Sequence, residues 1–200
     1  WFEKNGDCEM EAVLLGTAGF LLYFLYDVNS IVMKNGFLQK FFALGSVLEV
    51  ISVMWAMKLF GRQRAFCPVI VLLFAIGAAG FFLLLIYTLF FALPFEETYC
   101  KENTVRLAYT EGVYSLCRHP GVLWFAGAYL CLWGITGSVS GGGYFLSMIA
   151  WNFIYVILQD MWTFPHTFSN YLEYKKKTPF LFPNRKSIQE CLSHYTKDKR

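Results

Sequence analysis

The feature that most constrains this chain is one long apolar run. Between residues 67 and 95 there is no charged side chain. A helix needs roughly 20 apolar residues to cross a hydrocarbon core of about 30 Å, so this run can span a bilayer with tilt. A helix also satisfies its own backbone hydrogen bonds, which lipid cannot do. The run therefore predicts a membrane-spanning helix.

Composition extends this conclusion to the whole chain. Of its 200 residues, 56% are hydrophobic and 16% are charged, against roughly 45–50% and about 25% in soluble domains. The 21 Phe alone outnumber the 17 Lys and Arg. This balance excludes disordered, collagen-like, coiled-coil and small disulfide-rich proteins. A net charge of +3 is too small to indicate a nucleic-acid partner.

Four further stretches are apolar enough to be spanning helices. We therefore predict an all-α, polytopic transmembrane helix bundle that forms a single integral membrane domain over residues 1–200. The first stretch lacks a basic leader and a cleavage site, so we expect it to be retained. The glycine-rich link 136–143 predicts an antiparallel hairpin between the last two spans. The five predicted spans are residues 12–32, 41–60, 67–95, 120–135 and 144–162.

Basic residues are concentrated in the C-terminal tail, at 175–177 and within 184–200. By the positive-inside rule we expect the tail to be cytoplasmic. With five spans, the loop 96–119 lies on the same side. Both a bacterial inner membrane and the endoplasmic reticulum fit this topology, and the oligomeric state stays open.

The cysteines give no sign of a metal site or a disulfide framework. They contain no CxxC pair, and no histidine stands at metal-ligand spacing from any of them. We therefore predict no bound metal. The six are Cys8, Cys67, Cys100, Cys117, Cys131 and Cys191.

The segment Arg118-His119-Pro120 leads directly into the fourth predicted span. Proline is favoured at the first position of a helix, where free backbone N–H groups attract anions. Arg118 has a planar fork suited to a carboxylate or phosphate, and His119 can donate, accept or titrate near neutrality. The simpler alternative is that both side chains anchor the helix end among lipid headgroups.

Two blocks in this order resemble a known family. The runs Gly112-Val-Tyr-Ser-Leu-Cys-Arg-His-Pro120 and Tyr171-Leu-Glu-Tyr-Lys-Lys-Lys-Thr-Pro179 are similar to the isoprenylcysteine carboxyl methyltransferases and their phospholipid methyltransferase relatives. Those are integral membrane enzymes that use S-adenosylmethionine. The resemblance covers about residues 106–183 and implies a cytoplasmic cofactor pocket in the C-terminal half, beside an N-terminal three-helix part at 12–95.

The chain departs from the family pattern at two places. The family continues Arg-His-Pro-x-Tyr, whereas here Trp124 is the nearest aromatic residue. A family Glu-Glu pair at the end of the last span corresponds to Gln159 and Asp160. An acid at the bilayer surface is costly unless paired, so Asp160 is a candidate with Arg118 or the cofactor's ammonium as partner. A solvated interfacial acid is the alternative.

The resemblance therefore predicts methyl transfer from S-adenosylmethionine to a lipid-like acceptor, of the isoprenylcysteine carboxylate or phospholipid amine type. A dry cavity favours such a step, aromatic side chains can hold a sulfonium, and an amine acceptor needs a base. For Tyr171 and Tyr174, the alternative is that they are a pair of aromatic side chains at the membrane interface. The predicted catalytic residues are Arg118, His119 and Asp160, and the predicted cofactor-binding residues are Arg118, His119, Pro120, Gln159, Tyr171 and Tyr174.

Two other function classes stay open. Sterol-type membrane reductases that use NADPH also have Arg-His-Pro before a late helix, although they continue with Asn-Tyr. A non-catalytic lipid-binding protein of the same fold is the second. Within the spans, we expect Glu49 to face the bundle and pair with a cation or a backbone donor, a substrate role being open. We expect the small residues 77–80 to allow close helix packing.

Overall fold

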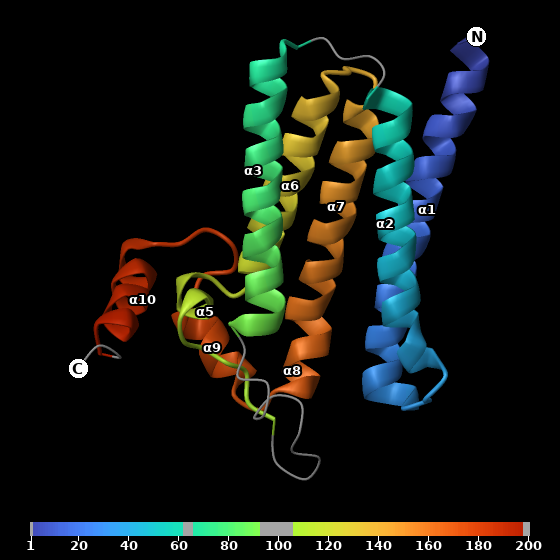
Figure 1. The fold of residues 1–200 in the computed structure, drawn as a ribbon. Helices are drawn as coiled ribbons and strands as arrows, with labels where there is room; N and C mark the ends of the chain where they lie inside the picture. Colours follow the sequence, from blue (N-terminus) through green and yellow to red (C-terminus); the bar gives the residue numbers. More distant parts are fainter. Residues whose placement is uncertain (1, 62–65, 93–105, 198–200) are drawn as a thin grey trace.

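The protein is a helical bundle, described here from a computed structural model (Figure 1). The structure describes residues 2–61, 66–92 and 106–197, and no strand occurs within these ranges. The long helices lie side by side and alternate in direction (Figure 1). They are α1 (Phe2–Val28), α2 (Phe41–Phe60), α3 (Pro68–Ile86), α6 (Pro120–Thr136) and α7 (Gly142–Leu158).

Shorter elements gather at the end of the bundle where α7 finishes (Figure 1). The helices there are α5 (Val113–Leu116), α8 (Phe164–Thr167) and α9 (Tyr171–Lys177), and α10 (Arg185–Lys197) stands beside them. Non-α turns extend the long helices at this end: η1 (Asn29–Met33), η2 (Leu38–Lys40), η4 (Tyr87–Phe91) and η5 (Gln159–Thr163).

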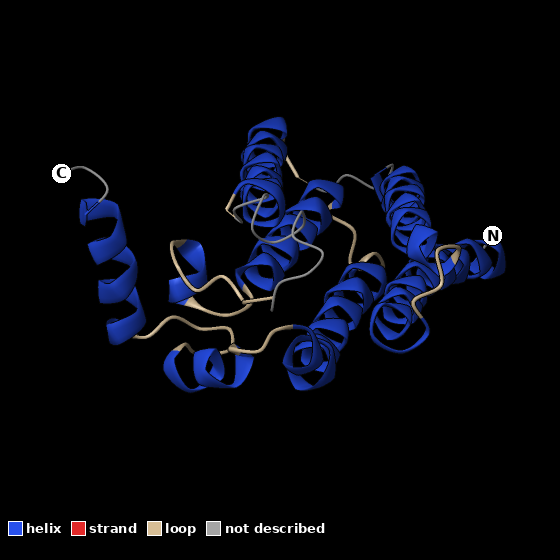
Figure 2. Ribbon diagram, turned by 90° about the horizontal axis from the view of Figure 1, so that it is seen from below, coloured by secondary structure: helices blue, strands red, loops and turns tan. Residues whose placement is uncertain are grey.

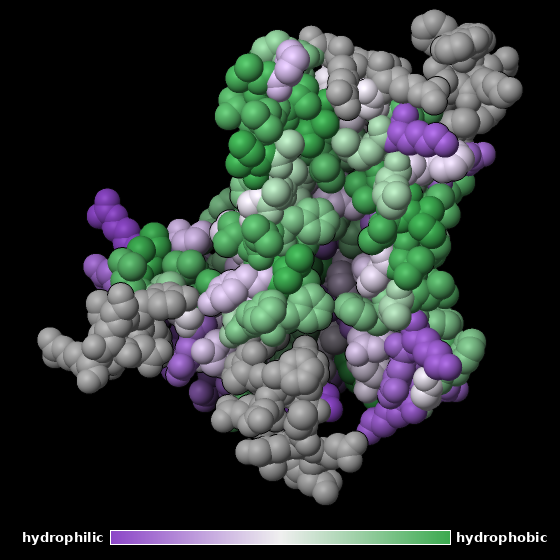
Figure 3. Space-filling view, in the orientation of Figure 1, coloured by the Kyte–Doolittle hydropathy of each residue, from purple (hydrophilic) through white to green (hydrophobic). Residues whose placement is uncertain are grey.

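Four helical stretches are long and apolar enough to cross a membrane: Glu9–Met33, Leu38–Phe60, Pro68–Phe91 and Gly142–Thr167. They confirm four of the predicted helices, although residues 93–95 of the third prediction lie outside the described part of the chain. Figure 3 shows apolar side chains over much of the upper bundle face. The fifth prediction corresponds to α6, which is apolar but has only 17 residues.

The bundle consists of two helix pairs joined by a fifth helix. In the first pair α1 packs on α2, and in the second α3 packs on α6. Helix α7 contacts both α1 and α6 and so connects the pairs, as the view along the bundle shows (Figure 2). The predicted α6–α7 hairpin is confirmed, and the chain leaves α6 through Gly137 at a φ of 61° that glycine tolerates.

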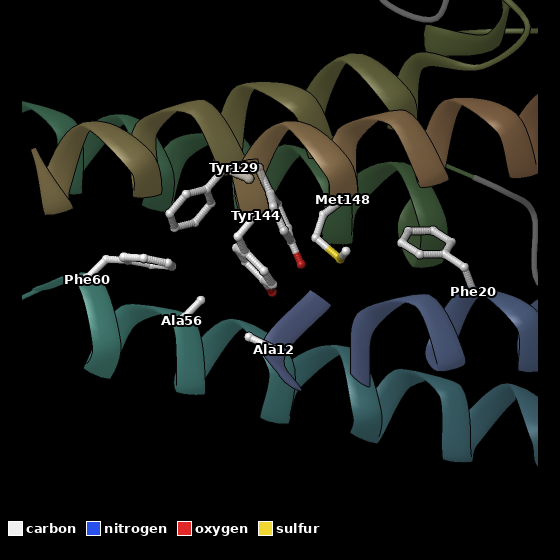
Figure 4. Close-up of a cluster of buried hydrophobic side chains, with 8 residues drawn as sticks. Ala12, Phe20, Ala56, Phe60, Tyr129, Tyr144 and Met148 are labelled. Atoms are coloured by element: carbon white, nitrogen blue, oxygen red, sulfur yellow. The ribbon is translucent and has the colours of Figure 1, made fainter. Parts of the chain in front are cut away.

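The core lies where α1, α2, α6 and α7 meet (Figure 4). Tyr144, Phe145 and Met148 of α7 have no exposed surface. The Ser52 hydroxyl donates to the Ala12 carbonyl over 2.8 Å and is 2.8 Å from the Tyr144 hydroxyl, which therefore donates to it. This chain of hydrogen bonds ties three helices together without leaving a polar group unpaired.

Glycines on α6 set the close approach of α3. A Cβ atom at Gly134 would stand 2.6 Å from the Phe74 ring, and one at Gly127 would stand 2.7 Å from the Phe81 ring. The predicted small residues of α3 contribute less: Gly77 faces the Cys131 sulfur at 3.0 Å, whereas Gly80 faces open space. The close contact therefore depends mainly on glycines of the partner helix.

We expect Gly134→Val to lower the free energy of unfolding by about 1–3 kcal/mol, because its side chain would displace the Phe74 ring from a packed interface. Thermal unfolding in detergent measures the effect. Gly80→Val, at a helical glycine that faces open space, is the matched control and should not destabilise the protein. Equal stability of all three proteins would show that the α3–α6 interface is not closely packed.

Candidate functional site

The candidate site lies where three long helices change their winding. Helices α1, α3 and α7 each continue into a π-helical turn at the same end of the bundle, namely η1, η4 and η5 (Figure 1). Such turns shift side chains out of the α-helical register and are frequent at functional sites. Turn η5 carries Gln159 and Asp160.

Asp160 is the centre of a buried hydrogen-bonded cluster, with an exposed fraction of 4%. Its Oδ1 accepts from Arg118 Nε at 2.8 Å and from the Tyr171 hydroxyl at 2.6 Å, and it lies 3.0 Å from His119 Nε2. Its Oδ2 accepts from Lys175 Nζ at 2.6 Å and from Arg118 Nη2 at 3.2 Å. The acid is therefore not a solvated interfacial group, and Arg118 and Lys175 are its charged partners.

The other edge of the Arg118 guanidinium holds the end of α9. Its Nη1 donates to the Thr178 carbonyl at 2.6 Å and to the Lys175 carbonyl at 3.2 Å. A cation is favourable at these C-terminal carbonyls. The backbone N–H groups of Arg118 and His119 donate to the carbonyls of Pro179 and Phe180. The two sequence blocks are thus joined through side chains and backbone together.

His119 sits immediately before Pro120, the first residue of α6, and stacks on Phe164 with ring centroids 5.7 Å apart. Burial lowers the pKa of His119 from its ordinary value of 6.5, against the opposing effect of the Asp160 hydrogen bond. The imidazole is therefore neutral at pH 7. Because Nε2 faces the Asp160 carboxylate, we assign the proton to Nε2 and the lone pair to Nδ1.

Both candidate tyrosines face the protein interior, with exposed fractions of 2% for Tyr171 and 5% for Tyr174. They are not an interfacial aromatic pair. Burial raises the pKa of each phenol above its ordinary range, so both remain hydrogen-bond donors at neutral pH. Tyr174 donates to the Tyr114 carbonyl at 2.6 Å. Burial also raises the pKa of the neighbouring Cys117 to about 11, so its thiol stays protonated.

Two residues singled out from the sequence point elsewhere. Gln159 Nε2 donates to Asp27 Oδ2 at 3.0 Å and to the Tyr155 hydroxyl at 2.8 Å. Trp124 Nε1 donates to the Thr88 hydroxyl at 3.1 Å. Gln159 therefore belongs to a second buried network, centred on a carboxylate of α1 that sequence reasoning missed.

A cavity of about 420 Å³ extends from the cluster into the bundle between the two helix pairs. His119, Pro120 and Gln159 line it at the cluster end, and Glu49, Tyr129 and Asn152 line it along the helices. Its rim includes half-exposed apolar side chains, namely Val50 of α2, Phe82 of α3 and Leu89 of η4. Figure 3 shows the surface hollowed between these two helices. The cavity is therefore open on the apolar flank of the bundle.

A second, polar pocket of about 310 Å³ adjoins the same cluster through Tyr174 and Thr178. It lies between α5, α9 and α10, and its charged and amide side chains are Asn170, Glu173, Lys177 and Glu190. Within the described ranges, no group of three or more His, Cys, Asp or Glu side chains is placed to hold a metal ion.

No protein-family model, curated protein or solved structure matches this chain. The resemblance of the two blocks to the membrane methyltransferases therefore stays a prediction from the sequence. Function has to be argued from the geometry of the cluster and its two cavities.

We expect Asp160→Asn to destabilise the protein by about 3–5 kcal/mol, because it leaves the buried Arg118 cation without its counter-charge. Chemical unfolding of the purified protein measures the change. Glu173→Gln, an exposed acid on α9, is the matched control and should have little effect. Equal unfolding of the two variants would contradict the central position of Asp160.

We expect the free energy of unfolding to decrease as the pH falls below about 6.5, the ordinary value for histidine. The unfolded chain binds a proton on His119 there, while the folded site resists it, so protonation favours unfolding. His119→Gln should flatten this pH dependence, whereas His166→Gln, at an exposed position, should keep it. Parallel pH profiles for both variants would refute a buried neutral His119.

Proposed function

We propose that this protein is an integral membrane methyltransferase that transfers a methyl group from S-adenosylmethionine to a lipid-like acceptor. One observation carries the proposal. The two family-like blocks, which are far apart in the sequence, meet around Asp160, and they do so beside a cavity that opens on the apolar flank of the bundle. His119, Arg118 and Tyr171 all belong to this meeting point. If Arg118 and His119 only anchored the start of α6 among lipid headgroups, the two blocks would not need to meet in this way.

The open cavity suits the acceptor. Its volume lies within the ~300–1,000 Å³ range of small-molecule sites, and its walls are mainly aromatic and aliphatic. A lipid can enter sideways between α2 and α3 without crossing the polar end of the protein. We therefore assign this cavity to an acceptor of the prenylated or phospholipid type, with its reacting end at His119.

The polar residues near the cluster suit the cofactor. Asp160 is outnumbered by Arg118 and Lys175, which leaves one excess positive charge that can attract the cofactor's carboxylate. Glu173 and Glu190 of the polar pocket offer acceptors for an ammonium group and for ribose hydroxyls. When bound, S-adenosylmethionine supplies an electrophilic methyl group on a sulfonium.

The residues then divide into two roles. Asp160 and Arg118 are positioning residues, because every contact above commits them to the protein's own groups. Asp160 holds the His119 imidazole in one tautomer, and the neutral ring is a base available for an amine acceptor. Phe164 stacks on the imidazole and Phe180 meets it edge-on, so both rings shield it from water.

The proposed topology places this end of the bundle in the cytoplasm. Lys34, Lys40 and the lysines of α9 lie at this end of the chain's helices, so the positive-inside rule favours it. In this topology α6 crosses the bilayer as a fifth span, with its 17 residues extended by the buried cluster at its start. The lysine-rich tail is then cytoplasmic.

One observation favours a second candidate, a non-catalytic lipid-binding protein of the same fold. Asp160 and Arg118 satisfy each other and the end of α9, so the cluster is complete without a cofactor. Such a protein would use the apolar cavity alone.

Titration of the purified protein with S-adenosylmethionine by calorimetry tests the proposal. We expect micromolar binding that His119→Ala weakens at least tenfold, because His119 contacts Asp160 and helps to fix Arg118 and Lys175, the cations assigned to the cofactor's carboxylate. Lys176→Ala, an exposed neighbour on α9, should bind like the wild type. Transfer of a labelled methyl group to prenylcysteine or phospholipid acceptors then identifies turnover.

The other outcomes are equally informative. Cofactor binding without transfer to any acceptor would favour the non-catalytic candidate. Absence of binding, or protection against thermal unfolding by NADPH alone, would reject the methyltransferase.

A further inference from the structure

Three buried acceptor atoms stand on the wall of the apolar cavity. Within the described part of the chain, the buried side-chain atoms that lack a hydrogen-bond partner are both carboxylate oxygens of Glu49 and Oδ1 of Asn152. Both residues line the cavity. The Tyr129 phenol interacts with Glu49 but is not in hydrogen-bonding geometry. All three atoms are acceptors, so what this part of the wall lacks is a hydrogen-bond donor directed at them.

Glu49 lies deep in the bundle, with an exposed fraction of 7%. It stands eight positions after Phe41, the first residue of α2, which is a rise of about 12 Å along the helix. It faces inward as expected, next to Gly19 of α1, where a Cβ atom would stand 2.8 Å from Oε1. An unpaired acid at this depth is costly and marks a functional position.

Among the residues that the structure describes, no cation is paired with Glu49. The basic side chains on the cavity wall are Arg118 and His119. Arg118 is already committed to Asp160 and to the end of α9, and His119 is neutral. The expected lysine, arginine or backbone donor is therefore missing around Glu49 among the described residues.

The remaining wall is rich in aromatic rings, including Phe20, Tyr23, Phe82, Phe125 and Tyr155. Aromatic faces attract cations, most strongly where water is excluded. A hydroxyl ligand has one proton to donate, whereas an alkylammonium has three and also supplies the positive counter-charge that is missing beside Glu49. The wall chemistry therefore favours a cationic amine over an alcohol.

We propose that the cavity between the helix pairs binds a lipophilic amine, with the ammonium on Glu49 and Asn152 and the hydrocarbon directed toward the rim between α2 and α3. The inference goes beyond the proposed function, because it places an ammonium group at Glu49, along the helices, whereas the reacting end of the methyl acceptor is assigned to His119 at the cluster end. Binding itself needs neither cofactor nor turnover.

Dodecylamine and dodecanol, two probes with the same chain, test the proposal on the full-length protein in an uncharged maltoside detergent. Native mass spectrometry gives the affinity, and thermal unfolding gives the stabilisation. We expect dodecylamine to bind the wild type at least tenfold more tightly than dodecanol. Glu49→Gln keeps the side-chain shape but removes the charge, and it should abolish this preference.

Asp27→Asn is the matched control. Asp27 is another buried carboxylate within the spans, but Gln159 and Thr163 donate to it and it does not line the cavity. This variant should keep the preference for the amine. We expect Glu49→Gln to fold at least as well as the wild type without ligand, because it replaces an unsatisfied carboxylate.

Equal affinity of the wild type for both probes overturns the proposal, and this comparison needs no variant. An unchanged preference in Glu49→Gln, or its loss in Asp27→Asn, overturns it as well. Because the cofactor is absent from these measurements, failure to bind S-adenosylmethionine would reject methyl transfer and leave the amine site standing.

Discussion

The shared carboxylate of Asp160 is the interaction on which the polar end of this protein depends. It joins the start of α6, the end of α7 and the helix α9 through Arg118, Tyr171 and Lys175. A charge buried at this depth is tolerated only with a complete set of donors. The same contacts fix His119 at the cavity wall. The contacts that stabilise the fold at this end of the bundle are thus the same contacts that set the geometry of the candidate site.

The arrangement of the helices explains why a cavity exists here. Helices α1 and α2 form one closely packed pair and α3 and α6 another, and α7 connects the pairs along one side only. Phe74 and Phe81 pack in the contact between α3 and α6, so these two rings do not reach into the space between the pairs. The cavity is the volume left between two well-packed units rather than a defect in either.

Much of this could be predicted from the sequence. Apolar runs locate four helices that are long and apolar enough to cross a membrane, and the two separate blocks around His119 and Tyr171 do meet in space. Lys175 was not predicted as a ligand of Asp160, because a run of lysines indicates a solvated tail. The hydrogen bond of Gln159 to Asp27 was not predicted, because the two residues lie on different helices far apart in the sequence. Glu49 is unpaired because of the residues that surround it in space, and the hydrophobic periodicity of the sequence holds no information about those neighbours.

The double use of Arg118 has a consequence for any ligand of this protein. One edge of its guanidinium holds Asp160 and the other holds the carbonyls that end α9, so neither is free to rearrange. An incoming molecule therefore meets a wall that is already rigid. The entropy of ordering that wall is lost during folding and not during association, which is the condition for preorganised recognition.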